Sequence, residues 1–341
     1  MLRVHFTDED LMRLRVAPGP DFLWEISNSV QTLQRRDGAR EFGAWRQWAR
    51  PRLTGNSRAL AGLLPPRGYS PDFLTPTTGD RSTFQAAVDT LLSTPRPRLR
   101  SELAQLAAER PLPPWAHLLA DGDADVLRSL GRSLHAWQRD ALAPFWRRVH
   151  AHIDVDRALR IRSLLDGGTE GLLTGLGPQF RWRPPYVLEV AYPVDQELRL
   201  RGRGLVLQPS FFCWPTPLTL ADAELPPVLV YPIHHTADWA GPSAEGGQLA
   251  ATGDSLGALL GHTRAAVLRA ARAGCSTVEL ARALTVTHPA VSQHVNVLRA
   301  AGLVTTVRRS GRSWHVATAE GRGLLDTADG QVPSGVPTRT V

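Results

Sequence analysis

One stretch near the end of the printed sequence, residues 276–316, constrains the fold more than any other part of the chain. Apolar residues recur at helical spacing in two short segments, and two segments of alternating side chains follow. Ser276 and Glu279 have the spacing of a capping box, in which each side chain binds the backbone N–H of the other residue. The pattern predicts two helices joined by a tight turn and followed by a β-hairpin, which is a winged helix-turn-helix.

The second predicted helix, residues 288–301, has recognisable ends. Thr287 is a candidate N-cap, and Pro289 falls in the first turn, where its missing N–H would have no partner anyway. Gly302 follows the last turn as a C-cap. We expect one side of this helix to face the core through Val291, Val295 and Leu298.

The other side of this helix carries short polar side chains near its N-terminus. Such side chains can bind base edges in the major groove, where Gln or Asn can form two hydrogen bonds with adenine. For a polar face taken alone, an ordinary solvated helix surface is the competing interpretation. The candidate DNA-contacting residues of the helix are His288, Pro289, Ser292, Gln293 and Asn296.

The predicted hairpin favours the interpretation of this polar face as a DNA-binding surface. Strands are predicted at 304–309 and 312–317, meeting at residues 310–311, where a glycine suits a two-residue turn. Trp314 and Val316 are predicted to alternate onto the inner face. Two helices with a basic hairpin predict DNA binding, in which arginines near the tip contact phosphates or the minor groove. These arginines are Arg308, Arg309 and Arg312.

Residues 256–326 resemble the ArsR/SmtB-type winged-helix regulators. The resemblance implies a homodimeric transcriptional regulator, usually a repressor, with Gln293 among the residues that read the groove. Metal-sensing members carry a Cys pair in the first helix of the motif, and the corresponding segment here has none. A thiolate metal switch is therefore not predicted. The resemblance is carried by residues 263–270, 278–284, 289–304 and 308–313.

The pairing of a long helical body with this C-terminal module also resembles a group of actinobacterial regulators of this type whose N-terminal region is a domain of unknown function. The opening residues, Leu-Arg-Val-His-Phe-Thr-Asp-Glu-Asp-Leu, add a resemblance that is weaker than that of the winged helix. It implies no particular ligand.

Charge is concentrated in the predicted DNA-binding module. Residues 256–326 contain nine arginines and three acidic residues, and so hold six of the seven net positive charges of the chain. A nearly neutral body that carries one basic module is typical of a regulator bound to double-stranded DNA. A dimer of such modules predicts a pseudo-palindromic operator.

The rest of the chain is predicted to be mainly helical, followed by strands. Helical patterns occur at 5–16, 21–35, 40–50, 82–93, 98–109 and 123–165, and Pro144 should end or kink the last of them. The fold class is α+β, mainly α, with a small antiparallel sheet of three or four strands. The expected domains are a helical regulatory or dimerisation domain at 1–178, a β-rich segment packed on it at 179–237, a linker at 238–254, the winged helix at 255–326 and a disordered tail at 327–341.

Tryptophans suggest a possible ligand site in the N-terminal part. They could line a pocket for an aromatic or polycyclic effector, but large aromatic side chains at helical spacing more often form core. Both interpretations stay open. The tryptophans considered are Trp24, Trp45, Trp48, Trp115, Trp137, Trp146, Trp182, Trp214 and Trp239.

Other functional classes find little support. His150 with His152, and His234 with His235, could supply nitrogens for Zn²⁺, but a spacing of two on a helix points the rings apart. No metal site, cofactor or catalytic motif is predicted, so we do not expect an enzyme. The chain has no long apolar run and no signal peptide, and Cys213 and Cys275 are isolated, which favours a cytoplasmic protein without membrane contact.

The sequence leaves three interpretations open. The first is a homodimeric repressor with recognition helix 288–301 and basic wing 304–317. The second is a regulator whose Trp-rich N-terminal domain binds an effector and then releases DNA. The third is a winged helix that binds a partner protein.

Overall fold

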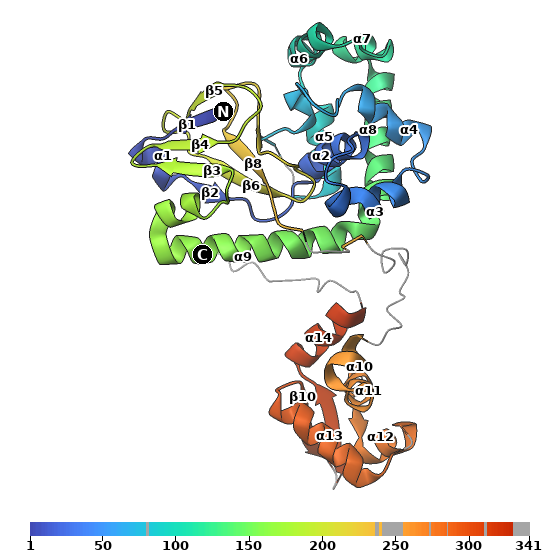
Figure 1. Cartoon of the computed structure of the whole chain (residues 1–341). Coiled ribbons are helices and arrows are strands. Elements are labelled where there is room, and N and C mark those ends of the chain that lie inside the picture. Colours follow the sequence, from blue (N-terminus) through green and yellow to red (C-terminus); the bar gives the residue numbers. More distant parts are fainter. Residues whose placement is uncertain are drawn as a thin grey trace. The chain divides into compact units, whose positions relative to one another are not determined.

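The computed structural model describes residues 1–79, 82–235, 239–240, 255–272, 274–284, 286–309 and 312–329. The chain divides into two compact units, Met1–Glu245 and Gly246–Val341 (Figure 1). The expected linker lies outside the described residues except for 239–240, and so does the expected tail beyond Asp329. Among the described residues, no helix is long and apolar enough to cross a membrane.

Most of the longer helices of the N-terminal unit lie where the sequence pattern predicts them. The long pattern at 123–165 is interrupted near Pro144, as predicted, by a π-helical turn at Gln138–Leu142 and a 3₁₀ turn at Ala143–Phe145. Proline has no N–H to donate and disrupts the preceding turn, which explains the break. The helices are α1 (Asp8–Met12), α2 (Phe22–Gln34), α3 (Ala39–Ala49), α4 (Gly55–Arg58), α5 (Phe84–Leu92), α6 (Arg96–Glu109), α7 (Trp115–Ala120), α8 (Ala124–Trp137) and α9 (Trp146–Thr174).

Helix α2 is buried on nearly all sides. Asp21 caps it by accepting from the backbone N–H groups of Leu23 at 3.0 Å and Trp24 at 3.1 Å. Its apolar side packs into the main core, as its pattern predicts. Its polar side is buried as well, through Glu25, Ser27, Asn28, Ser29 and Thr32. The helix therefore forms the centre of the N-terminal unit.

The strands of this unit form two mixed sheets, so the predicted single antiparallel sheet is wrong. One sheet has the order β3-β4-β1-β5, with β1 antiparallel to β4 and parallel to β5. The other has the order β2-β6-β8-β7, with parallel β2–β6 and β6–β8 pairs. The strands are β1 (Leu2–His5), β2 (Arg15–Val16), β3 (Phe180–Arg183), β4 (Val187–Val190), β5 (Gln196–Arg199), β6 (Val206–Ser210), β7 (Leu218–Thr219) and β8 (Val228–Pro232).

The opening residues explain this difference. The sequence interpretation expected one helical element at 5–16, but each sheet takes a strand from the first sixteen residues, with only the short α1 between them. Leu2 and Val4 are fully buried and pair with strands that lie far along the chain. A local pattern does not reveal so distant a partner, and parallel pairing needs long connections.

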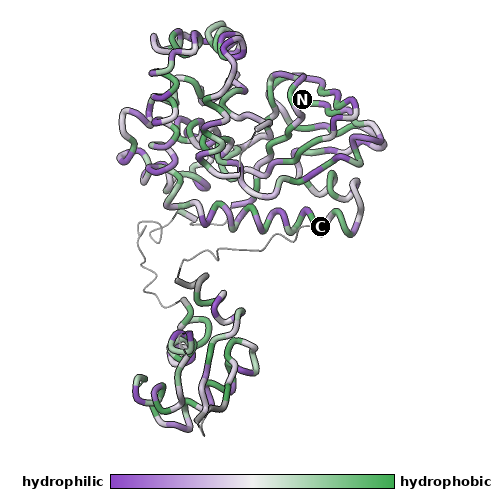
Figure 2. Tube along the Cα trace, turned by 180° about the vertical axis from the view of Figure 1, so that it is seen from behind, coloured by the Kyte–Doolittle hydropathy of each residue, from purple (hydrophilic) through white to green (hydrophobic). Residues whose placement is uncertain are grey.

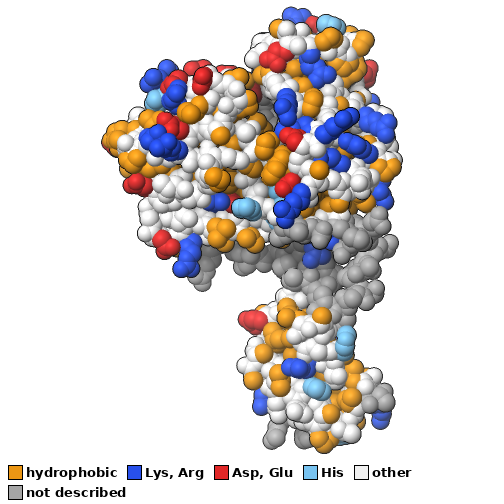
Figure 3. Space-filling model, viewed as in Figure 1, with side chains coloured by type: hydrophobic (Ala, Val, Ile, Leu, Met, Phe, Trp, Pro, Cys, Tyr) orange, Lys and Arg blue, Asp and Glu red, His pale blue; other side chains and the backbone are white. Residues whose placement is uncertain are grey.

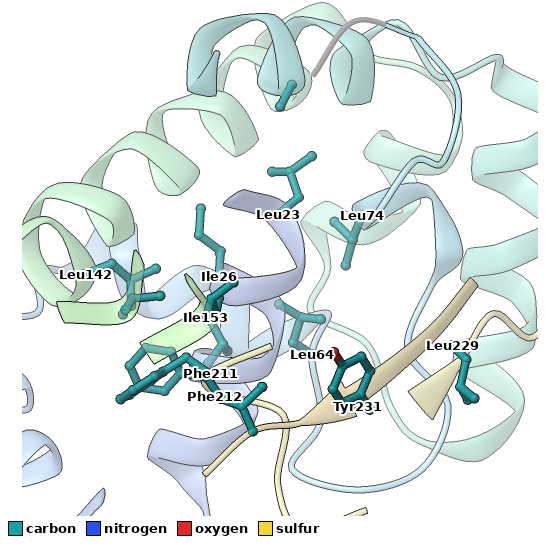
Figure 4. Close-up of a cluster of buried hydrophobic side chains, with 14 of the residues drawn as sticks. Leu23, Ile26, Leu64, Leu74, Leu142, Ile153, Phe211, Phe212, Leu229 and Tyr231 are labelled. Carbon is teal, nitrogen blue, oxygen red and sulfur yellow. The ribbon is translucent and has the colours of Figure 1, made fainter. Parts of the chain in front are cut away.

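A single large hydrophobic cluster joins the helices and both sheets of the N-terminal unit. Phe211 and Phe212, which follow β6, lie in this cluster with Ile26 of α2 and Ile153 of α9 (Figure 4). Because the cluster draws on segments from both ends of Met1–Glu245, the helical and β-rich parts form one unit with a shared core.

The C-terminal unit has its own core and a three-stranded sheet of order β10-β11-β9. The class α+β, mainly α, is confirmed for the chain. The elements are α10 (Ser255–Leu260), α11 (His262–Ala270), β9 (Cys275–Ser276), α12 (Thr277–Leu284), α13 (His288–Ala300), β10 (Val304–Arg309), β11 (Arg312–Ala317) and α14 (Ala319–Asp329).

Candidate nucleic-acid interface

Helix α12 begins at the predicted capping box. The Ser276 backbone N–H donates to Glu279 Oε2 at 2.7 Å, and the Glu279 N–H donates to Ser276 Oγ at 3.3 Å. Two backbone donors at the helix start thus have partners, which fixes where the helix begins. Leu280 and Ala281 are buried and hold α12 on the core beneath α13.

Helix α13 separates apolar and polar residues by its two sides. Thr287 occupies the N-cap position with extended backbone, although its side chain makes no capping hydrogen bond. Val291, Val295 and Leu298 are buried in the core of the unit. The candidate contact residues His288, Pro289, Ser292, Gln293 and Asn296 are all exposed.

The C-terminal end of α13 is fixed by a glycine. Gly302 has a φ of +73°, and a Cβ built there would meet no atom within 4 Å. The constraint at this position is therefore one of backbone conformation, which glycine adopts more readily than other residues. The Leu303 N–H then donates to the Leu298 carbonyl oxygen at 2.9 Å, and the chain turns into β10.

Strands β10 and β11 pair over the predicted ranges. Their antiparallel register places Arg309 opposite Arg312, and Arg308 opposite Ser313. The backbone thus brings the three wing arginines to the loop end of the hairpin. Residues 310–311, where the turn was predicted, lie outside the described residues.

The prediction for the inner face of the wing is wrong. Trp314 is 40% exposed, whereas the residues of the alternate set, His315 and Ala317, are only 5% and 1% exposed. Judged by hydropathy alone, Trp314 and Val316 would be expected on the inner face of the wing. The small Ala317 and a hydrogen-bonded histidine fill the inner side, where β11 packs on α12 and on β9.

His315 was not among the sequence candidates, yet it connects three elements of the unit. Its Nε2 lies 2.8 Å from Thr277 Oγ1 at the start of α12, and its Nδ1 lies 3.0 Å from Thr306 Oγ1 on β10. A neutral imidazole can donate through one nitrogen and accept through the other. Burial lowers the pKa of His315, and the charge of Arg299 lowers it further. Thr306 and His315 lie opposite one another in the hairpin. The predicted pairing of the two strands is therefore the one sequence signal from which this contact could have been expected.

The histidine pairs considered for metal binding have other surroundings. His152 Nδ1 lies 2.7 Å from the Arg148 carbonyl oxygen, and His150 packs edge-on against Trp146. His235 Nε2 donates to the Phe211 carbonyl oxygen at 2.7 Å. Within the described part of the chain, no group of three or more His, Cys, Asp or Glu residues is placed to hold a metal ion.

The tryptophans divide between core and cavity. Trp45, Trp137 and Trp239 are buried in the main core. Trp24 and Trp214 instead line a cavity of ≈ 540 Å³ in the N-terminal unit, between α2, residues 64–75 and residues 192–221. Neutral hydrogen-bonding groups in its wall include Ser27, Asn28, Gln31, Thr32, Ser70 and Thr75.

Three charged groups of this cavity, Arg35, Asp37 and Arg67, form a cluster of ion pairs. Arg35 Nε donates to Asp37 Oδ1 at 2.9 Å, and this pair holds the pKa of the Asp37 carboxyl below its usual value. Arg67 also lies 3.5 Å from Asp37. By contrast, the buried indole N–H of Trp24 has no hydrogen-bond partner among the described residues.

One comparison with known proteins gives a match, and it falls on the C-terminal unit. A family described as a helix-turn-helix domain matches residues 260–307. The match runs from the end of α10 through both helices of the motif into β10. No curated protein and no solved structure matches the chain. The C-terminal unit therefore contains a helix-turn-helix domain of the DNA-binding kind.

Proposed function

We propose that the chain is a sequence-specific transcriptional regulator, a homodimeric repressor of the ArsR/SmtB type. The observation that carries this proposal is the division of α13, whose apolar side is buried in a helix-turn-helix domain while its polar side is exposed. A polar helix held rigidly by its own core suits insertion into the major groove. In this reading the N-terminal unit regulates the domain and performs no catalytic step.

The proposed contacts are of two kinds: residues that contact base edges, called readers here, and residues that bind the DNA backbone or the minor groove, called clamps. Gln293 and Asn296 would hydrogen-bond to base edges, with Ser292 and His288 beside them. Pro289 starts the helix and would pack against the DNA next to these groups. The wing arginines, Arg308, Arg309 and Arg312, would bind phosphates or the minor groove.

Dimerisation follows from the size of the interface. A single winged helix makes few contacts, and two of them related by a two-fold axis would read a pseudo-palindromic site. Its half-sites would lie about one or two helical turns apart.

The direct test is a titration of the full chain with a labelled duplex from upstream of its own gene, followed by fluorescence anisotropy. A scrambled duplex serves as the control, and both titrations are repeated at several salt concentrations. We expect preference for the native duplex and an affinity that falls steeply with salt, because bound arginines displace counterions. Equal and weak binding of both duplexes would instead favour a winged helix that binds a protein partner.

The cavity in the N-terminal unit favours a second candidate function, release of DNA on binding an effector. The Arg35–Asp37 pair has no net charge, and the two other carboxylates of the wall, Asp72 and Glu109, accept hydrogen bonds from backbone N–H groups. Since the rest of the wall is formed largely by aromatic and neutral polar groups, the cavity suits an uncharged ligand that has an aromatic or polycyclic face.

A screen of uncharged aromatic compounds tests this function. Binding should raise the unfolding temperature and change the tryptophan fluorescence of the full chain, since Trp24 and Trp214 line the cavity. The same compounds should then dissociate the protein from its operator. Compounds that bind without changing DNA affinity would argue against gating.

A further inference from the structure

Helix α9 exposes an unusual number of large apolar side chains. Val155 is 65% exposed, Leu159 57%, Ile161 50% and Leu165 80%. Residues on the other side of the same helix, including Val149 and Ile153, are buried in the core. Large apolar side chains gathered on one exposed surface are typical of an interaction site.

Two rows of exposed residues run along this side of the helix at intervals of seven, and two of the four large apolar residues, Ile161 and Leu165, lie in them. Ala151, Ala158 and Leu165 form one row, and Asp154 and Ile161 form a second row beside it. All five are exposed. A seven-residue repeat keeps one seam of a helix facing a second helix along its length. Both hydrophobic and hydrophilic residues occur along α9 (Figure 2).

We propose that this stripe pairs two copies of the chain, with the two α9 helices antiparallel and crossing at Ala158. This inference rests on the proposed homodimer and assigns its interface. A two-fold axis at Ala158 places Asp154 opposite Arg162 of the partner subunit, and Arg162 opposite Asp154 of the partner subunit. The same axis places Val155 opposite Ile161 of the partner subunit.

The charges select the antiparallel arrangement. In a symmetric parallel pair, Asp154 would face Asp154 of the partner subunit and the arginines would also face each other, which is unfavourable. In the antiparallel pair both contacts are attractive. The small side chain of Ala158 at the crossing lets the two backbones approach closely, as pairing around a two-fold axis requires.

The ion pairs that Asp154 and Arg162 form within α9 do not prevent them from pairing with a second copy of the chain. Asp154 lies 3.3 Å from Arg157, and Arg162 lies 3.5 Å from Asp166, both within the helix. Arg162 is 81% exposed and Asp154 60%, and pairs as exposed as these contribute little to stability. Both side chains can therefore turn toward a second copy.

The extent of the stripe limits the strength of the dimer. Gly167 and Gly168 leave helical geometry, so the straight part of α9 ends just after Leu165. Residues 151–165 span about 21 Å. Helix α9 runs along one edge of the N-terminal unit (Figure 1), with the sheets of that unit on one side of it. An interface built on one helix pair is small, so we expect dissociation near micromolar concentration, with DNA adding avidity.

Charge reversal tests the pairing in solution. Sedimentation velocity of the full chain at about 50 µM, well above the micromolar dissociation expected for a small interface, should show a dimer. Asp154→Arg and Arg162→Asp should each give a monomer, and the double variant should restore the dimer because the attraction returns with reversed signs. Leu164→Asp changes an exposed residue about 120° around the helix from Ala158 and serves as the matched control. It should remain dimeric, and thermal unfolding should show that all variants are folded.

A cross-link locates the axis. Under mild oxidation Ala158→Cys should form a disulfide between two copies, whereas Leu164→Cys should not. The native cysteines, Cys213 and Cys275, are buried and serve as the background. A monomeric wild-type chain, or single charge variants that stay dimeric, would overturn the proposal. Neither outcome affects the DNA-binding test, since a monomer that prefers its operator would leave the regulatory function standing.

Discussion

Glu25 and His235 bind the same buried segment after β6. Glu25 accepts from the Phe211 and Phe212 N–H groups at 2.8 and 3.0 Å, and His235 donates to the Phe211 carbonyl oxygen. Burial raises the pKa of Glu25 to about 7 and lowers the pKa of His235 to about 4. Both shifts favour the neutral form, so the folded N-terminal unit prefers both groups uncharged.

The two titrations act on stability with opposite signs. Below pH 6.5 the unfolded chain gains a proton on His235 that the folded unit rejects, so stability is lost as the pH falls. Glu25 gains its proton in the folded unit first, so stability is lost as the pH rises from 4.5 toward 7. Between pH 5 and 7 the two effects partly offset each other in the wild type.

The variant His235→Gln removes one of the two effects. Its amide can still donate to the Phe211 carbonyl oxygen but does not titrate. Relative to wild type, the free energy of unfolding of the variant should rise by about 2 kcal/mol between pH 7 and pH 5. Urea unfolding followed by tryptophan fluorescence measures this difference. Parallel pH profiles for the two proteins would show that His235 is not held neutral.

At the interface, the assignment of readers and clamps gives a second prediction at the scale of single residues. Gln293→Ala should weaken operator binding by about 1–3 kcal/mol and leave random DNA unaffected. Arg309→Ala should weaken binding to both duplexes by similar amounts, because a phosphate contact does not depend on the base. Anisotropy titrations on the two duplexes measure both effects. If both variants lowered operator and random binding equally, the assignment would be incorrect.

At the scale of elements, the sequence predicts best where the determining contacts are local. The capping box of α12, Pro289 in the first turn of α13 and the two wing strands need only near neighbours, and each lies where its pattern indicates. Contacts between segments that lie far apart in the chain cannot be predicted from such local patterns. The pairing of β1 with β4 and β5 is one example, and the cavity is another, since its walls come from separate segments.

The inner face of the wing shows a third limit. Alternation indicated that residues of β11 face two ways, but hydropathy assigned the wrong face, because His315 satisfies its polar atoms with two threonines. The exposure of the five candidate residues on α13 could be predicted from sequence. Their chemistry remains a prediction that experiments on DNA must test.

Gly302 provides a prediction for the end of α13. Gly302→Ala should lower the stability of the C-terminal unit by about 1 kcal/mol, since the added Cβ has open space and only the positive φ opposes it. Gly323→Ala, at a position in α14 with no positive φ and no atom within 4 Å of the Cβ, is the matched control. That change should stabilise the unit by up to about 1 kcal/mol. Thermal unfolding followed by circular dichroism compares the two, and equal effects would contradict the role of Gly302.

At the scale of the molecule, the chain holds two units with separate cores. On the face shown in Figure 3, acidic and basic side chains are interspersed over the N-terminal unit. The excess of arginine in residues 256–326 places most of the net positive charge in the unit that contains the helix-turn-helix domain. Separate cores allow one unit to bind an effector or a second copy while the other binds DNA.

Separate cores also predict separate unfolding transitions in calorimetry. Leu298→Ala truncates a side chain that is 1% exposed and should cost about 2–5 kcal/mol, lowering only the transition of the C-terminal unit. Val30→Ala, at a fully buried position of α2, should lower only the other transition. A single transition that both variants shift would show that the two units unfold together.

Selection of DNA from a pool of random duplexes tests the central claim most directly. The full chain would be mixed with the pool at moderate salt, and the retained duplexes would be sequenced over successive rounds. The proposed function predicts enrichment of an inverted repeat with half-sites about one or two helical turns apart, and a weaker or altered motif with Gln293→Ala. Retention without any enriched sequence, lost uniformly as salt rises, would contradict sequence-specific recognition by α13.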